Sequence, residues 1–328
     1  MSVLILGNSE VEELLSMKEC IAVMRDALVA LARGEVFQPL RSVVKPPDAA
    51  GLLGLMPSFI SGNRPALGLK AISVFPGNAA KGKDIHQGVV LLLDPETGEL
   101  RAIMNASAVT SIRTAAVSGV ATDLLARADA SVLAIIGTGV QARSHLKAMS
   151  EVRVFGRCRV ASRSNDKARA FANELQKYFS FPIEPVESAE TAVENADVIV
   201  TATTASEPVI RREWIADGAH INAVGACIPT VREIDGATMA AASVFVDRRE
   251  SAVNEAGDYL LAFNEGVIGP DNIHAEIGEA LNGDKTGRTS RDEITLFKSL
   301  GLAVEDVAAA EYLYRKAEKL NAGAWVNF

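Results

Sequence analysis

The sequence predicts an α/β fold that combines a doubly wound parallel sheet with a second domain of α+β type. Between residues 132 and 246, short apolar segments alternate with helical segments, which is typical of parallel strands joined by crossover helices. Residues 131–142, SVLAIIGTGVQA, join a strand to a helix through a glycine-containing turn. The residues before 126 contain several short apolar runs that proline and glycine interrupt.

The bulk composition excludes several classes of protein. The chain has 328 residues, enough for two domains, and its net charge of −8 without a Lys/Arg run argues against nucleic acid as a partner. Cys20, Cys158 and Cys227 show no paired spacing, so we expect neither a disulfide framework nor a metal site. No apolar run is long enough to span a membrane and no signal peptide is recognisable, so we expect a cytoplasmic protein.

The first part of the chain is expected to form a helix, a set of strands and a second helix. The first helix is predicted over residues 8–33, with Asn8 or Ser9 as its cap and Gly34 at its end. The strands, in a sheet or half-barrel, are predicted at 41–45, 51–56, 66–75, 88–93 and 100–104. A helix over 109–125 follows, and the polar segment 127–130 is the predicted domain boundary.

The second part is expected to be the parallel sheet. Its strands are predicted at 132–136, 159–161, 196–202, 220–224 and 243–246. A last helical stretch over 294–317 is too short to be a domain, so we expect the chain to return to the first domain. The predicted domains are therefore 1–125 with 302–328, and 126–301.

The turn after the first strand of this sheet carries the motif GxGxxA, from Gly137 to Ala142. Gly137 allows a tight turn, Gly139 lets the backbone approach a pyrophosphate, and Ala142 lets the helix pack close to the strand. A plain turn is the alternative, but the flanking strand and helix favour a Rossmann-type dinucleotide site. The expected cofactor contacts in the turn are Gly137, Thr138, Gly139, Val140 and Gln141.

The end of the second strand indicates which dinucleotide is bound. An acidic residue there would bind the ribose hydroxyls of NAD, whereas this chain has Ser162 and Arg163. A hydroxyl and a guanidinium suit a 2′-phosphate, so NADP(H) is favoured and NAD(H) remains an option. The alternative is that Arg163 is a solvated residue at the entry of the next helix.

Three cations lie in apolar contexts: Arg41 in QPLRSVV, Lys70 in LGLKAIS and Arg113 in TSIRTAA. A buried charge needs a partner, which is either a substrate carboxylate or a structural salt bridge. Of the four histidines, His86 opens a strand and is a candidate for substrate contact, whereas the other three are expected to be structural. No HExxH, Walker or Cys/His motif is present.

Over nearly its whole length the chain resembles the ornithine cyclodeaminase/mu-crystallin family. The matching segments include QPLRSVV, GLMPSF, HQGVVLLLDPETGEL, IIGTGVQA, ADVIVTATTASEPV and TLFKSLGLAVEDVAAA. The resemblance implies a substrate-binding and dimerisation domain made of both chain ends, a Rossmann domain between them, and a homodimer. It also implies nicotinamide-dependent chemistry at the Cα of an amino acid.

The resemblance assigns roles to individual positions. Arg41 and Arg113 match carboxylate-binding arginines, and Lys70 matches an active-site lysine that binds the carboxylate or transfers a proton. Met56, in the matching GLMPSF segment, is expected at the substrate together with His86. The further residues expected at the cofactor are Thr114, Thr201, Ala202, Thr203, Val224, Gly225, Lys298 and Gly301.

Two departures from the family pattern bear on the reaction. Ornithine cyclodeaminases have an aspartate where this chain has Cys227, and a glutamate where it has Gly54. A thiol is a poor replacement for a carboxylate base, because its ordinary pKa lies well above 7. Cyclodeamination is therefore disfavoured. Cys227 is either a catalytic residue or a small filler beside the site.

The predicted function is NAD(P)H-dependent reduction of a small 2-imino acid, such as pyrroline- or piperideine-2-carboxylate, to the L-amino acid. Reductive amination, as in alanine dehydrogenase, and reduction of iminosuccinate to aspartate are alternatives. Iminosuccinate needs a further cation, which Lys45, Arg64, Lys81 or Lys83 would supply. Ornithine cyclodeamination and non-catalytic NADPH binding are the remaining alternatives.

Overall fold

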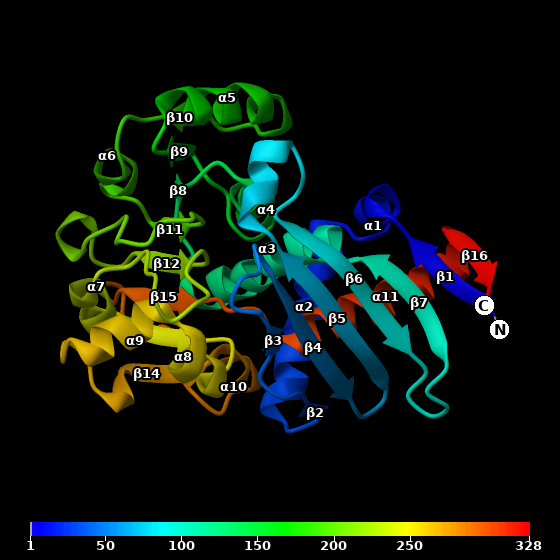
Figure 1. The fold of residues 1–328 in the computed structure, drawn as a ribbon. Coiled ribbons are helices and arrows are strands. Elements are labelled where there is room, and N and C mark those ends of the chain that lie inside the picture. The colour runs from blue at the N-terminus through cyan, green and yellow to red at the C-terminus, as the bar shows by residue number, and fades with distance from the viewer. Residues whose placement is uncertain (1) are drawn as a thin grey trace. The chain divides into compact units, whose positions relative to one another are not determined.

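The computed structural model describes residues 2–328, except for the side chain of Ala79. The chain folds into two compact units (Figure 1). Unit 1 contains residues 1–113 and 301–328, and unit 2 contains residues 114–300. The first division therefore falls inside a helix and not in the polar segment 127–130. The predicted domain bounds and the roles of the domains stay predictions.

Unit 1 contains a mixed sheet with the strand order β16-β1-β7-β6-β5-β4-β2, and β3 pairs with β4. Only the β1–β7 pair is parallel among these described strands. The strands are β1 Ser2–Leu6, β2 Val36–Phe37, β3 Ser42–Val44, β4 Leu52–Ile60, β5 Ala66–Val74, β6 His86–Leu93, β7 Leu100–Asn105 and β16 Ala324–Asn327. Sequence analysis missed β1 and β16, which pair with each other at the edge of the sheet.

The helices of unit 1 are α1 Asn8–Leu14, α2 Met17–Ala32, η1 Pro76–Lys81, the first part of α3 Ala106–Leu125, and α11 Ala303–Leu320. Of these, α11 packs on β4, β5, β6 and β7 and against α2. The alternating burial of β4 and β5 directs one set of side chains into a core with α2 and α11, which includes Ile60, Ala66 and Val307.

The single helix predicted over residues 8–33 is wrong. The chain forms α1 and α2 separately, and Gly7, not Asn8 or Ser9, precedes the first of them. The break occurs because Ser16 and Glu19 form a capping box that begins α2.

Unit 2 contains an eight-stranded, all-parallel sheet with the order β10-β9-β8-β11-β12-β15-β13-β14. The chain runs outward from β8 to β9 and β10, and then continues on the other side of β8 with β11. The doubly wound parallel sheet expected from the sequence is confirmed. The strands are β8 Val132–Ile136, β9 Arg157–Ala161, β10 Ile183–Pro185, β11 Val198–Thr201, β12 His220–Ala223, β13 Ser243–Val246, β14 Ile273–Glu276 and β15 Thr295–Lys298.

The helices of unit 2 connect these strands. They are the second part of α3, α4 Val140–Val152, α5 Asn165–Leu175, η2 Gln176–Tyr178, α6 Ala189–Val193, η3 Arg212–Trp214, α7 Gly236–Ala241, α8 Arg249–Glu255, α9 Gly257–Asn264, η4 Pro270–Asn272 and α10 Ile277–Asn282. Within residues 2–328, no helix is long and apolar enough to cross a membrane.

The helical stretch predicted over residues 294–317 is wrong in its first part. Residues 295–298 form β15 between β12 and β13, and the helix α11 begins only at Ala303. All four residues of β15 are buried. A strand buried on both faces lacks polar–apolar alternation, so its sequence resembles that of a buried helix.

Candidate functional site

The glycine turn lies at the carboxyl end of β8 and has the shape that a dinucleotide phosphate requires. Gly137 has a φ of +119° and donates its N–H to the Ala161 carbonyl at 2.9 Å. A Cβ at Gly137 would overlap the carbonyl oxygen of Ala202, so β8 and β11 approach each other closely here. A Cβ at Gly139 would contact no heavy atom within 4 Å.

The amino terminus of α4 is open to a ligand. Gly139 precedes this 13-residue helix and supplies no side-chain cap. The first N–H groups of a helix have no partner within the helix and attract anions. Ala142 is fully buried against the sheet. These residues fit the pyrophosphate of a nicotinamide dinucleotide.

At the end of β9, Ser162 is half-buried and Arg163 is exposed. The cap of the following helix α5 is Ser164, whose hydroxyl accepts the Lys167 N–H at 3.4 Å. Arg163 is therefore not needed to begin that helix.

The ends of β11 and β12 are joined by a carboxylate that sequence analysis missed. Glu233 is fully buried and accepts the Thr203 N–H at 2.6 Å, the Gly225 N–H at 2.6 Å and the Thr201 hydroxyl at 2.9 Å. Three residues predicted at the cofactor thus meet at one side chain. The segment REID around Glu233 has no spacing or motif that would have indicated this role.

A second buried carboxylate, Asp258 at the start of α9, supports the first. It accepts the backbone N–H groups of Glu233 at 2.7 Å and Ile234 at 2.9 Å. Its other oxygen lies 2.9 Å from Nζ of Lys298, which also donates to the Ala223 carbonyl at 3.3 Å. Lys298 is fully buried in this ion pair.

The pKa values of Lys298 and Glu233 depend on burial, which disfavours the charged form, and on nearby groups of opposite charge. Burial opposes the charge of Lys298, but attraction to Asp258, Cys227 and Glu233 outweighs it and raises the pKa of Lys298 above its ordinary value. Burial raises the pKa of Glu233, against the effects of Lys298 and Thr203. The Cys227 thiol is half-buried and donates to the Val224 carbonyl at 3.3 Å.

In unit 1, the cations predicted at the substrate lie in one buried cluster. Lys70 stands on β5 directly opposite Met56 of β4, and its Nζ lies 2.7 Å from Asp306. Arg113 contacts Asp306 at 3.0 Å through Nε and Glu305 at 2.5 Å through Nη1. Asp306 therefore bridges Lys70 and Arg113.

Gly301 lies between two of the arginines. Its carbonyl accepts a hydrogen bond from Nη2 of Arg41 at 3.1 Å. Its φ is +79°, and a Cβ would lie 2.6 Å from Nη1 of Arg113. These contacts place Gly301 in the cation cluster, and its predicted position at the cofactor stays a prediction.

For Lys70 and Arg113 the structure shows the salt-bridge alternative. Glu305 and Asp306 supply their counter-charges. Sequence analysis missed both carboxylates, which begin α11 almost 200 residues after Arg113. Arg41 adjoins the same cluster through the Gly301 carbonyl.

The surroundings of Lys70 change its pKa. Burial lowers the pKa of Lys70 to about 8, with Asp306 opposing the shift and Arg113 adding to it. His86, at the start of β6, has its pKa lowered by desolvation and by the charge on Lys70.

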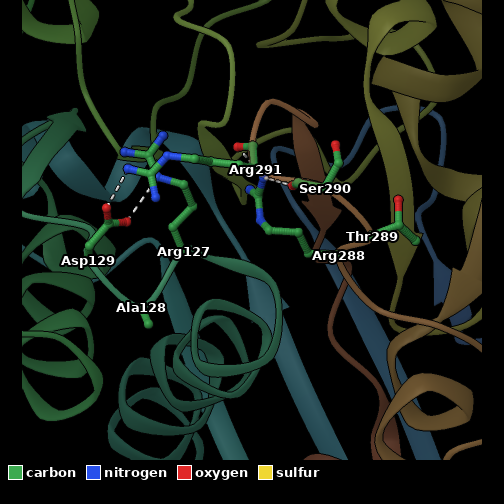
Figure 2. A pocket seen from close by; sticks show the side chains of 7 residues that line it. All are labelled: Arg127, Ala128, Asp129, Arg288, Thr289, Ser290 and Arg291. Atoms are coloured by element: carbon green, nitrogen blue, oxygen red, sulfur yellow. Dashed lines mark hydrogen bonds and ion pairs between the residues drawn. The ribbon is translucent and has the colours of Figure 1, made fainter.

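A cavity of about 470 Å³ lies at the opposite edge of the parallel sheet, before β8 and β15. Figure 2 shows Arg127 and Arg291 directed at Asp129. Arg127 also pairs with Asp197, and Arg288 donates to the carbonyls of Leu125 and Ala219. These guanidinium groups hold strand ends together. Among the described residues, no cluster of His, Cys, Asp or Glu could hold a metal ion.

Comparison with known proteins adds to this geometry. A sequence model of the ornithine cyclodeaminase/mu-crystallin family matches residues 1–321. A Delta(1)-pyrroline-2-carboxylate reductase of Bacillus cereus is 40% identical over 326 residues, which cover 99% of this chain and 100% of the relative.

Two solved structures are similar over the whole fold. The Delta(1)-pyrroline-2-carboxylate reductase of Thermococcus litoralis, in complex with NADH and L-proline, is 41% identical with a TM-score of 0.96, covering 99% of this chain and 100% of that one. An archaeal alanine dehydrogenase dimer with bound NAD is 36% identical with a TM-score of 0.94, and the match covers 100% of both chains.

Proposed function

Since the chain belongs to the ornithine cyclodeaminase/mu-crystallin family, we propose that it is an NAD(P)H-dependent oxidoreductase that reduces pyrroline-2-carboxylate to L-proline. The observation that carries the proposal is the grouping of Arg41, Lys70 and Arg113 around Gly301 and Asp306, because grouped cations suit a substrate carboxylate. The relatives named for this reaction support the choice of a cyclic imine.

The residues of unit 1 bind and orient the substrate. Arg41, the most exposed of the three cations, binds the carboxylate. Lys70 and Arg113 are buried and add to the positive charge of the site. The nicotinamide, when bound, supplies the hydride for the imine carbon. Lys70 holds a proton near neutral pH with a pKa of about 8, which suits donation to the imine nitrogen.

The proposed role of Arg41 can be tested by steady-state kinetics. Replacing Arg41 by Met should raise KM for the imine strongly, because a charged hydrogen bond to the carboxylate is lost. The KM for the reduced cofactor should change less than the KM for the imine, since the lost contact is assigned to the substrate carboxylate. An unchanged KM for the imine would contradict the assignment.

The preference for NADP(H) over NAD(H) is a separate part of the proposal. The exposed guanidinium of Arg163 and the hydroxyl of Ser162 are available to a 2′-phosphate. Replacing Arg163 by Ala should weaken NADPH binding by about ten- to a hundredfold, the value of one or two charged hydrogen bonds. NADH binding should stay within about twofold by the same measure. Equal losses for both cofactors would contradict a 2′-phosphate contact.

Three alternative reactions are compared by how well their substrates suit the cations Arg41, Lys70 and Arg113. A 2-oxo acid such as pyruvate also carries one carboxylate, so alanine dehydrogenase activity is the second candidate. Iminosuccinate carries two, and the cations suggested for the second one, Lys45, Arg64, Lys81 and Lys83, are all exposed. For cyclodeamination, Cys227 and Gly54 replace the expected acids.

A substrate panel distinguishes these activities. Oxidation of NADPH and NADH is followed with pyrroline-2-carboxylate, piperideine-2-carboxylate, pyruvate plus ammonia, and oxaloacetate plus ammonia. We expect the highest kcat/KM with a cyclic imine. A higher value with pyruvate plus ammonia would make the protein an alanine dehydrogenase, and tight NADPH binding without any turnover would make it a binding protein.

A homodimer is the proposed assembly, supported by the outward face of the mixed sheet. The row Pro57, Leu69, Leu91, Ile103 and Ile5 crosses five neighbouring strands on the face away from the helices. All five are apolar, and none is fully buried. Replacing Leu91 by Lys should shift the mass in solution from dimer to monomer. A dimeric Leu91→Lys protein would exclude this face as the interface.

A further inference from the structure

The carboxylate of Glu233 has a function beyond holding unit 2 together. We propose that Glu233 is a positioning residue for the nicotinamide half of the cofactor, which it serves by fixing the backbone at Thr203 and Gly225. This inference rests on the proposed dinucleotide-dependent function. Glu233 does not touch the reacting atoms.

The three partners of Glu233 require an acceptor. Thr203 N, Gly225 N and the Thr201 hydroxyl all donate, and they divide between the two carboxylate oxygens. A glutamine of the same shape accepts on one side only, and its NH₂ group then opposes a donor on the other side. Glu233→Gln therefore keeps the volume of the side chain and breaks one end of the bridge.

The segments that Glu233 joins cannot move independently. A Cβ on Gly225 would overlap the Thr203 carbonyl oxygen and lie 2.6 Å from Oε1 of Glu233. The loop between residues 225 and 233 is also fixed at its end, because Asp258 accepts hydrogen bonds from the N–H groups of Glu233 and Ile234. A change at Glu233 is thus transmitted directly to the backbone of Thr203 and Gly225.

The strand order assigns Glu233 to one half of the ligand. Ser162 and Arg163 follow β9, the glycine turn follows β8, and Glu233 lies at β11 and β12. Strands in a sheet are about 4.8 Å apart, so β9 and β12 are separated by about 14 Å. A dinucleotide bound across the carboxyl ends of such a sheet has its two halves on opposite sides of the switch point. Glu233 therefore acts on the half remote from the adenosine.

The chain offers a matched control. Glu293, before β15, likewise accepts two backbone N–H groups and one threonine hydroxyl, from Thr289 and Ser290. It lies at the amino-terminal edge of the same sheet, where no ligand is proposed. All three bonds end on Oε2, so Glu293→Gln keeps an acceptor for them and controls for the loss of a carboxylate charge in unit 2 without affecting the ends of β11 and β12.

The test compares equilibrium binding of two probes, NADPH and adenosine 2′,5′-bisphosphate, which lacks the nicotinamide half. For Glu233→Gln we expect NADPH to bind about tenfold more weakly and the adenosine probe to bind as in the wild type. The kcat should fall while KM for the imine stays unchanged. Glu293→Gln should change neither affinity.

Equal weakening of both probes, or of neither, would overturn the proposal. If Glu233→Gln does not fold, Thr201→Val removes one donor from the same carboxylate and should give the same selective loss on a smaller scale. A wild-type protein that binds neither these probes nor NADH would instead refute the dinucleotide-dependent function, so the two failures are distinguishable.

Discussion

Each compact unit buries a cluster of charged side chains, and the two clusters differ in what their carboxylates contact. In unit 1, Lys70 and Arg113 meet the carboxylates of Glu305 and Asp306. In unit 2, Lys298 pairs with Asp258, but Glu233 and Asp258 also accept four backbone N–H groups.

The two kinds of contact have different consequences. In unit 2 the carboxylates fix the backbone, through the N–H groups of Thr203 and Gly225 on Glu233 and two more on Asp258. In unit 1 the carboxylates fix cationic side chains. The comparison teaches that a buried carboxylate can position either a loop or a cation, and only the second arrangement groups positive charges where a substrate carboxylate is proposed to bind.

The largest expected effect comes from breaking the cluster of unit 1 at Arg113. Arg113→Met leaves Glu305 and Asp306 with fewer counter-charges, and breaking a buried pair costs about 3–5 kcal/mol of unfolding free energy. We expect kcat/KM for the imine to fall about a thousandfold, because a charge that binds the substrate is lost as well. Denaturant unfolding and steady-state kinetics measure the two effects.

A double variant separates stability from binding. Arg113→Met with Glu305→Gln removes one charge of each sign and should regain most of the stability, but not the activity. Recovery of turnover in the double variant would mean that Arg113 serves only as the partner of Glu305.

Sequence analysis could identify the cations of this cluster but not its carboxylates. Arg41, Lys70 and Arg113 stand out because each interrupts an apolar segment. Glu305 and Asp306 lie in the first turn of α11, where acidic residues are common at any helix start. Their pairing with Lys70 and Arg113 depends on how a distant helix packs, which no local pattern contains.

The same limit applies in unit 2. The glycine turn and β8 could be predicted because strand, turn and helix are adjacent in the sequence. β15 could not, because a fully buried strand has no alternation. Glu233 could not either, since its partners at β11 and β12 are brought to it only by the fold.

A smaller effect should follow from the titration of Lys70. Its pKa of about 8 in the folded protein lies below the ordinary value of 10.5. The unfolded chain therefore binds more protons between these values, so the Lys70 contribution to stability rises with pH from about 8 to 10.5. Activity should move in the opposite direction. If protonated Lys70 is required, kcat/KM for imine reduction falls about tenfold per pH unit above this pKa.

Asp306 provides the check on this assignment. Asp306→Asn removes the charge that supports protonated Lys70, so the fall in kcat/KM should begin at lower pH. The comparison is made with pH profiles of both proteins at saturating reduced cofactor. An identical profile in Asp306→Asn would show that the titrating group is not Lys70.

The smallest expected effect concerns Cys227 beside the cluster of unit 2. Its thiol donates to the Val224 carbonyl and so has a backbone partner. Cys227→Ala removes this weak hydrogen bond and a little volume, and we expect kcat to change by less than about fivefold, the worth of about 1 kcal/mol. Cys227→Ser is the matched control, because it keeps a donor of similar size. A loss of a hundredfold or more in Cys227→Ala, with activity retained in Cys227→Ser, would make the side chain a proton donor in the reaction and not a filler. The buried cluster of Glu233, Asp258 and Lys298 in unit 2 would then lie next to a residue of the chemistry as well as serving in positioning.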